Sequence, residues 1–526
     1  MKTSTIRTLL LSFILLASAC SPPSERETDL IYGLTLAPSG LDPHLNASAE
    51  LGIPLSSVYD TLLFRDPETG DFVPGLAKSW KTSPDGLTYT FQLRDDVRFH
   101  DGTPFNATAV KANIDYALDP DNHSQKAASM LGPLIETTVL NDYLVSFQLS
   151  EPYAPLLDSL SQVYLGMASP AALEKWGPAE YQFHQIGSGP YRFVEYIPNE
   201  HIVLERNPDY AWGPSIYRNK VASIERIEFR FYENEATRSL ALESGQVDVI
   251  GEVPFREAQR LDEMERFKLY PVAIPGQPME FYFNTRKPPT DDPLVRAALT
   301  LSVDRAGIVE TLFGSTSPVA SGPLSADLFA PFLGDALLDF DPDRAASLLE
   351  QAGWADLDGD GIREKAGQDL TLTLVTPTWG ANPQAAQLID VSWEILGANV
   401  EVVTAPAFGP LKERQSSGNY HAIGLNFFGT DPDLLRPSYR SDGLFNWSGA
   451  EDPELDRLLE LAANESGDAA TRASLYREAI SRIDDAYLVL PVRDYMNLVV
   501  ARTDLSGLRF SLQGWFPFLI DLEFSS

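Results

Sequence analysis

The sequence predicts a mixed α/β protein with more than one domain. At 526 residues the chain exceeds one ordinary hydrophobic core, so we expect two or three domains. Residues 224–250 show the strand–helix–strand order of an α/β lobe, with a helix that begins after Asn234 and ends at Gly245. Hydrophobic residues make up 44% of the chain, which is typical of a globular protein rather than a disordered one.

The N-terminus has the pattern of an export signal. Residues 1–19 are predicted to be a signal peptide, because a basic start is followed by an apolar run that is too short to span a bilayer. The run ends at Ala17-Ser18-Ala19, immediately before Cys20, the only cysteine. These residues fit an ordinary secretory cleavage site, and small residues before a cysteine also resemble a lipoprotein box, although Ala17 replaces the usual leucine.

We prefer the lipoprotein interpretation, because a lone cysteine at the first mature position is hard to explain as a structural residue. Residues 20–29 would then form a polar tether behind a lipidated Cys20. The expected location is the periplasm or the cell surface, with the protein anchored to a membrane through the lipid. No other cysteine remains, so the exported chain is expected to fold without disulfides.

Charge and motif content exclude several classes of function. The net charge of -34 argues against nucleic-acid binding, which needs a basic face, and solubility is its ordinary explanation. The chain has no Gly-x-Ser-x-Gly elbow, no His-Glu-x-x-His motif and no phosphate loop. We therefore expect no catalysis, no cofactor and no resident metal.

Two weaker sequence patterns would instead indicate a metal. Asp356, Asp358 and Asp360 imitate the first half of an EF-hand loop, but Gly367 stands where the bidentate glutamate should be, so a solvated turn is preferred over calcium. His421 lies in a predicted strand leading to the proposed site, which leaves nickel recognition as a minor alternative to a half-buried strand histidine.

The most informative stretch is residues 74–118. Apolar residues alternate with polar ones over residues 87–93, which predicts a strand with one buried face. Asn106 is a predicted helix N-cap, and Val110, Ile114 and Leu118 fall on one face of the helix that follows. Nothing in this block suggests catalysis.

The same block resembles the signature of family 5 solute-binding proteins, the extracytoplasmic receptors of ABC importers for dipeptides, oligopeptides and, in some branches, nickel complexes. The likeness is carried by Ser79-Trp80, by Asp85-Gly86 with Tyr89-Thr90-Phe91, and by the run from Val97 to Ala107 (VRFHDGTPFNA). Shorter likenesses occur at Gly187-Ser188-Gly189-Pro190, at residues 281–285 and at Asn446-Trp447-Ser448-Gly449.

The resemblance implies a two-lobed fold of the type II periplasmic-binding-protein kind, with an extra subdomain inserted in lobe I. Lobe I is expected over residues 30–270 and 495–526, with the insertion at 65–186, and lobe II over 271–494. The implied function is capture of di- or oligopeptides between the lobes and delivery to the permease and ATPase subunits of an importer, by a monomer. The alternatives are a receptor for a nickel complex or other small solute, and a ligand-sensing lipoprotein without transport.

The predicted ligand site consists of the loops that follow Leu36, Val375 and Phe428, because the carboxyl ends of strands in α/β lobes are where ligands bind. Its candidate residues are Ser39, Tyr282, Trp379, Phe428, Asp431 and Asp433. In peptide-binding members of the family an aspartate near the last loop pairs with the peptide's α-amino group, a role that either Asp431 or Asp433 would inherit. The Asp-Pro-Asp sequence also fits a plain helix start. Asp42 and His44 are expected to be a turn cap and a surface histidine.

Overall fold

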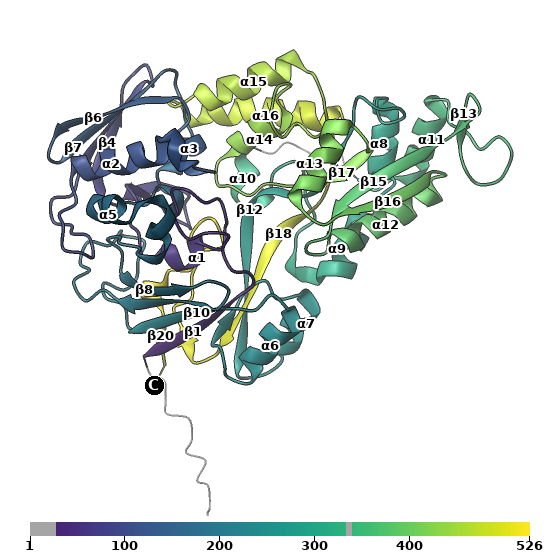
Figure 1. Cartoon of the computed structure of the whole chain (residues 1–526). Helices are drawn as coiled ribbons and strands as arrows, with labels where there is room; N and C mark the ends of the chain where they lie inside the picture. Colours follow the sequence, from purple (N-terminus) through teal and green to yellow (C-terminus); the bar gives the residue numbers. More distant parts are fainter. Residues whose placement is uncertain (1–27, 333–338, 526) are drawn as a thin grey trace, which may run out of the picture.

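The computed structural model describes residues 28–332 and 339–525 (Figure 1). The predicted signal peptide and Cys20 lie outside the described residues. Within these two ranges, no helix is both long and apolar enough to cross a membrane.

The framework of the molecule is a ten-stranded sheet with the order β16-β15-β17-β12-β18-β11-β1-β10-β9-β8. Six of its strands come first in the sequence: β1 (Asp29–Leu34), β8 (Tyr191–Ile197), β9 (His201–Arg206), β10 (Arg226–Phe231), β11 (Val249–Ile250) and β12 (Phe267–Phe283). The remaining strands are β15 (Thr371–Pro377), β16 (Asn399–Ala405), β17 (Ala422–Gly424) and β18 (Val489–Arg502). β1 runs parallel to β10 and β11, and β15 runs parallel to β16 and β17, so each end of the sheet contains an α/β unit.

Two long antiparallel strands, β12 and β18, join these units in the centre of the molecule (Figure 1). The predicted lobe boundary after Pro271 falls inside β12, where Pro271 pairs with Leu498. The boundary before Tyr495 falls inside β18, where Tyr495 pairs with Ile274. Both boundaries therefore lie within long strands rather than in loops, and the domain limits stay a prediction.

Lobe I is covered by α1 (Gly52–Leu55), α6 (Glu235–Glu243) and α7 (Phe255–Asp262), with the short strands β2 (Leu63–Arg65), β19 (Leu505–Ser506) and β20 (Glu523–Phe524); β2 pairs with β3 (Phe72–Pro74), which lies within the predicted insertion. Asn234 caps α6 as predicted, because its side chain accepts a hydrogen bond from the Thr237 amide at 3.0 Å. Gly245, at φ 72°, follows the end of this helix. Glycine adopts this backbone conformation without the steric cost that a side chain would add.

A second, four-stranded sheet lies within the predicted insertion, with the order β4-β5-β7-β6. Its strands are β4 (Ala77–Thr82), β5 (Thr88–Leu93), β6 (Leu134–Asn141) and β7 (Leu144–Leu149), and its helices are α2 (Ala107–Leu118), α3 (Ala127–Met130), α4 (Leu156–Ser159) and α5 (Pro170–Glu180). The predicted strand corresponds to β5, and Asn106 caps α2 by accepting from the Ala109 amide at 3.0 Å.

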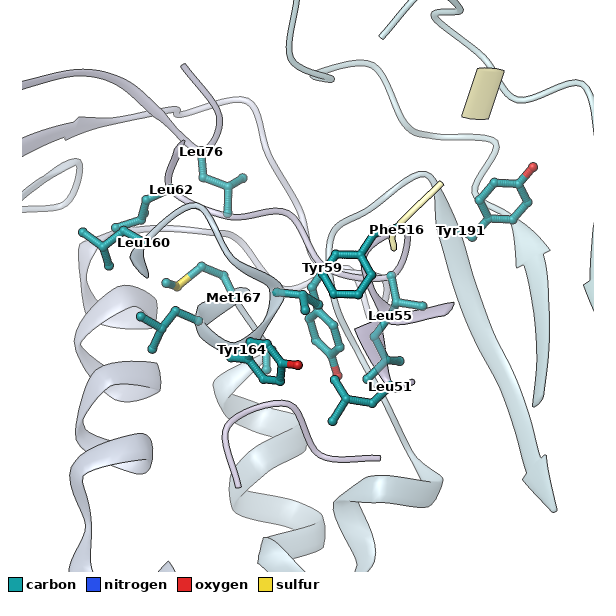
Figure 2. Close-up of a cluster of buried hydrophobic side chains, with 14 of the residues drawn as sticks. Leu51, Leu55, Tyr59, Leu62, Leu76, Leu160, Tyr164, Met167, Tyr191 and Phe516 are labelled. Carbon is teal, nitrogen blue, oxygen red and sulfur yellow. The ribbon is translucent and has the colours of Figure 1, made fainter. Parts of the chain in front are cut away.

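The hydrophobic core of this sheet is continuous with that of lobe I. Phe91 and Phe147 of the small sheet belong to the same buried cluster as Leu55, Tyr191 and Phe516. Figure 2 shows part of this cluster, in which side chains from several segments of lobe I pack together. Because they share one core, the insertion and lobe I are expected to move as one unit.

Lobe II carries nine helices within the described residues: α8 (Pro293–Leu301), α9 (Arg305–Phe313), α10 (Ala326–Phe329), α11 (Pro342–Gln351), α12 (Asn382–Ile395), α13 (Phe408–Ser417), α14 (Leu435–Tyr439), α15 (Pro453–Asn464) and α16 (Ala469–Asp485). A small hairpin of β13 (Glu364–Lys365) and β14 (Gln368–Asp369) projects from it. The predicted Asp-Pro helix starts are confirmed, since Asp292, Asp341 and Asp452 accept hydrogen bonds from the first turns of α8, α11 and α15.

Candidate functional site

An aromatic contact joins lobe II to the C-terminal segment of lobe I. Phe428, which is 43% exposed, lies just beyond β17 in the third predicted loop. Its ring meets the ring of Tyr495 edge-on at 4.9 Å between centroids, and the ring of Trp515 at 5.9 Å. Trp515 packs against the core of lobe I, so the Phe428–Trp515 contact connects the two lobes. We call Phe428, Tyr495 and Trp515 the aromatic contact.

Two polar groups beside this contact have no protein partner. The Tyr495 hydroxyl donates to Oδ1 of Asn426 at 3.0 Å, but the Nδ2 amide group of Asn426 is buried without a hydrogen-bond partner in the described structure. The indole Nε1 of Trp515 is buried without a partner as well. Unpaired buried donors are costly, and a polar ligand that accepted from them would remove this cost.

A buried cation lies behind the aromatic contact. The guanidinium group of Arg493 lies 4.3 Å from the centroid of Tyr495 and 3.9 Å from that of Phe313. It donates to the Ser317 hydroxyl at 3.1 Å, and no carboxylate within the described residues lies within ion-pair distance of it. Burial lowers the pKa of Arg493 to about 10.

A polar bridge holds the neighbouring loop against lobe I. Asp158 at the end of α4 accepts from Arg65 at 2.7 Å and from the Thr430 hydroxyl at 2.7 Å. Arg65 also donates to the Thr430 carbonyl at 2.9 Å. Thr430 is two residues from Phe428, so this Arg65–Asp158–Thr430 bridge and the aromatic contact restrain the same loop.

Both candidate amine anchors are already paired with arginines. Asp431 receives two hydrogen bonds from Arg472, at 2.6 and 2.9 Å, and Asp433 receives two from Arg436, at 2.8 and 2.9 Å. Asp431 also accepts from the Asp433 amide at 2.8 Å, which is the helix start that the Asp-Pro-Asp sequence allows. A ligand ammonium group would have to displace an arginine, so this geometry does not support either anchor.

The other predicted site residues differ in exposure. Ser39 is exposed, and Trp379 is 42% exposed just beyond β15. The role of Tyr282 as a ligand contact stays a prediction; in this conformation its hydroxyl accepts from the Gln277 side chain at 2.7 Å, and the residue is fully buried. The reason is register: Tyr282 pairs with Ile423 and Val489 in the centre of the sheet and its ring packs against Tyr439.

His421 and His44 are both engaged in structural contacts. Nδ1 of His421 accepts from the Thr373 amide at 2.8 Å, which leaves the proton on Nε2 to donate to the Pro288 carbonyl at 3.1 Å. Burial lowers the pKa of His421 to about 4. Neither nitrogen is free to coordinate nickel. His44 is buried rather than at the surface, because its ring contacts Tyr116 and the Gly166 carbonyl, whereas Asp42 caps its turn as expected.

The aspartate-rich loop gains a fourth acid that its sequence pattern did not indicate. Oxygen atoms of Asp356, Asp358, Asp360 and Glu364 lie within 4.8 Å of one another. The three aspartates are exposed and already accept hydrogen bonds from backbone amides of the loop. This arrangement fits a solvated turn, and the preference for a turn over a calcium loop stays a prediction.

The comparisons with known proteins identify the family. Residues 71–449 match the family model described as bacterial extracellular solute-binding proteins, family 5 Middle. The chain belongs to this family. It is therefore a solute-binding protein of the kind that serves ABC importers, and its fold is that of the type II periplasmic binding proteins.

Three relatives illustrate the range of the family. The nickel-binding periplasmic protein of Escherichia coli K12 is 29% identical over 531 residues, covering 95% of this chain and 94% of that protein. A glutathione-binding protein GsiB from Pectobacterium atrosepticum is 29% identical over 344 residues, covering 64% of each chain. The crystal structure of NikA from Brucella suis in complex with Fe(III)-EDTA has a TM-score of 0.84 at 27% identity, covering 94% of this chain and 100% of that one.

Proposed function

We propose that this protein is an exported receptor that encloses a small solute where Phe428, Tyr495 and Trp515 meet, and delivers it to the permease of an ABC importer. The supporting observation is the aromatic contact between the lobes, with two unpaired N–H groups beside it. Apolar walls with a few convergent polar groups are typical of small-molecule sites. The solute leaves chemically unchanged, and ATP is hydrolysed on other subunits.

The first ligand candidate is nickel, or a similar transition metal, held by a small organic chelator. The nickel-binding relative matches nearly the whole chain, and the arginine pairs of Asp431 and Asp433 disfavour an amine anchor at these positions. Because both nitrogens of His421 are engaged, the chelator rather than this histidine would supply the metal's ligands.

A short peptide is the second candidate. The glutathione-binding relative supports it, and so does Glu252, which follows β11 and is exposed. Its carboxylate accepts from the Thr35 hydroxyl at 2.8 Å and has no lysine or arginine at ion-pair distance within the described residues. A peptide ammonium group could pair with this carboxylate in place of Asp431 or Asp433.

A lipid anchor at Cys20 would keep the receptor at the membrane. We propose that Cys20 is the first mature residue and carries a lipid that holds the receptor at the membrane. Mass spectrometry of the membrane-extracted protein should show a lipid mass on an N-terminal Cys20. A soluble mature form that begins at unmodified Cys20 would rule the anchor out.

The aromatic contact provides the test of the site. Calorimetry with Ni(L-His), Fe(III)-EDTA, glutathione and the dipeptide Met-Leu should find at least one solute that binds. Phe428→Ala and Trp515→Ala should each weaken that solute at least tenfold, about 1.4 kcal/mol, because each removes an aromatic wall.

Phe408→Ala is the matched control. Phe408 on α13 is also 43% exposed, but its ring packs on Phe445 and Trp447 rather than on a ring of the aromatic contact. The solute affinity of the Phe408→Ala variant should stay within twofold of the wild-type value. Unchanged affinity in both the Phe428 and Trp515 variants would refute this position for the site.

A further inference from the structure

Glu280 is a buried carboxylic acid in the core of lobe II. It lies on β12, where it pairs with Pro491 of β18, and it is 1% exposed. Both oxygen atoms of its carboxyl group are buried without a hydrogen-bond partner in the described structure. The described groups that act on its charge include no lysine, arginine or histidine. A buried carboxylate without a partner is far more costly than a neutral acid, so this environment favours the protonated form.

Hydrogen bonds connect the strand of Glu280 to the Phe428 loop, which we define as residues 425–430. Tyr282 lies two residues further along β12, on the same face as Glu280. Its hydroxyl accepts from the Gln277 side chain at 2.7 Å, and the Gln277 side chain accepts from the Phe427 amide at 3.0 Å. The Tyr282 hydroxyl also acts on the pKa of Glu280. The carboxyl group therefore adjoins a hydrogen-bonded path that ends one residue before Phe428.

The backbone of β12 lies directly against the same loop. Gly276 forms a β-bridge with Phe428, and a Cβ atom at Gly276 would lie 2.6 Å from the Cα of Phe428. The Leu425 amide donates to the Glu280 carbonyl at 3.3 Å. The two segments are thus in backbone contact on both sides of Gln277, so the Phe428 loop covers the part of β12 that carries the buried acid.

We propose that Glu280 is a protonated acid in the folded protein, and that opening of the Phe428 loop exposes this acid to water and releases its proton. A neutral carboxyl group can stay in the dry core, whereas an ionised one needs water or a counter-ion. Loop opening is therefore favoured as the pH rises. The consequence for solute capture rests on the proposed function, because Phe428 belongs to the aromatic contact, but the proton release itself does not.

The pH dependence follows from the surroundings of Glu280. Burial raises its pKa well above the ordinary value of 4.5, the Tyr282 hydroxyl opposes this shift, and the charge of Asp484 on α16 adds to it. The other titratable groups nearby are Tyr439 of α14 and Tyr495 of β18, on which the charge of Glu280 acts. The folded state holds a proton that the opened or unfolded state loses above about pH 4.5. The contribution of this acid to stability is therefore complete below that pH and is lost as the pH rises towards the folded pKa.

The first test compares the wild type with Glu280→Gln, which keeps the shape of the side chain but cannot ionise. Urea unfolding is followed from about pH 5 to about pH 9. Relative to the variant, the unfolding equilibrium constant of the wild type should rise about tenfold per pH unit until the folded pKa is reached. An infrared difference spectrum at neutral pH should show the carbonyl band of a protonated acid in the wild type that Glu280→Gln lacks.

The second test measures the opening of the loop by hydrogen exchange. The amides of Leu425, Phe427 and Gly429 all donate to β12, so they exchange only when the loop leaves the strand. At each pH the wild type and Glu280→Gln are compared, which cancels the intrinsic exchange rates. The ratio of their exchange rates should increase with pH as the unfolding constant does. Glu401→Gln is the control, because Glu401 is exposed on β16 of the same sheet, and this variant should match the wild type throughout.

The outcomes test the two parts of the inference separately. If the wild type and Glu280→Gln have the same pH profile of unfolding, or the same infrared spectrum, Glu280 is not a protonated acid and the inference fails. If unfolding differs but the exchange ratio of the loop amides stays constant with pH, the link to the loop fails. The proposed function is decided by calorimetry on the Phe428 and Trp515 variants, so its failure and the failure of this inference are distinguishable.

Discussion

Asp158→Asn is expected to lower the free energy of unfolding by about 3 kcal/mol, because removing one member of a buried ion pair leaves the other charge uncompensated. The side chains of Arg65 and Asp158 are 15% and 5% exposed, and the neutral amide of asparagine cannot neutralise the charge of the guanidinium group. The loss should appear as a lower midpoint in urea unfolding at pH 7. Since Asp158 also holds Thr430, the variant should sample more open conformations and bind solute more weakly.

Asp95→Asn is the control for this result. Asp95 also pairs with a cation, Lys78, but the two side chains are 59% and 45% exposed. The pair is screened by water, and its loss should leave the unfolding midpoint unchanged. Equal midpoints for Asp158→Asn and the wild type would contradict a stabilising bridge between the lobes.

Asp431→Asn is expected to lower the free energy of unfolding by about 3 kcal/mol, because it too leaves a buried arginine without its counter-charge. The solute affinity should change little. Both partners of the Asp431–Arg472 pair are only 15% exposed, and the variant leaves Arg472 without its bidentate acceptor. Chemical denaturation measures the first quantity, and calorimetry below the unfolding transition measures the second.

Unchanged stability together with a loss of peptide affinity would instead support Asp431 as the anchor for a peptide amine. If Asp431→Asn unfolds like the wild type but loses the binding of peptides with a free amino group, Asp431 contacts the ligand rather than holding α16. Weaker binding of N-acetylated peptides would show only that some carboxylate pairs with the amine, since Glu252 would give the same result, so the Asp431→Asn variant itself has to decide the assignment.

Local features of the fold were predictable from the sequence because their causes are local. The alternating residues of β5 lie on opposite faces of one strand, and the Asn106 and Asn234 caps act within three residues of themselves. The lobe limits were not predictable in this way. β12 and β18 continue through both proposed boundaries, so no loop or linker in the sequence marks where one lobe ends.

The site was predicted only in part, because its contacts join residues distant in sequence. Phe428 was a candidate from the sequence because it ends a predicted apolar strand, and its role in binding, like that of Trp379, stays a prediction. Trp515 was missed because the segment around it has no periodicity, and its contact with Phe428 spans the two lobes. The arginine partners of Asp431 and Asp433 lie on other turns or helices, so a free aspartate and a paired one look alike in sequence.

Closure of two lobes over an unmodified solute is the central claim, and small-angle scattering tests it most directly. The protein would be unfolded to remove any bound solute, refolded, and measured with and without a saturating amount of the solute that calorimetry identifies. Because solute that contacts both lobes stabilises the closed form, the radius of gyration should fall on binding, and mass spectrometry should recover the solute intact. An unchanged radius at saturation, or a chemically altered solute, would contradict the claim.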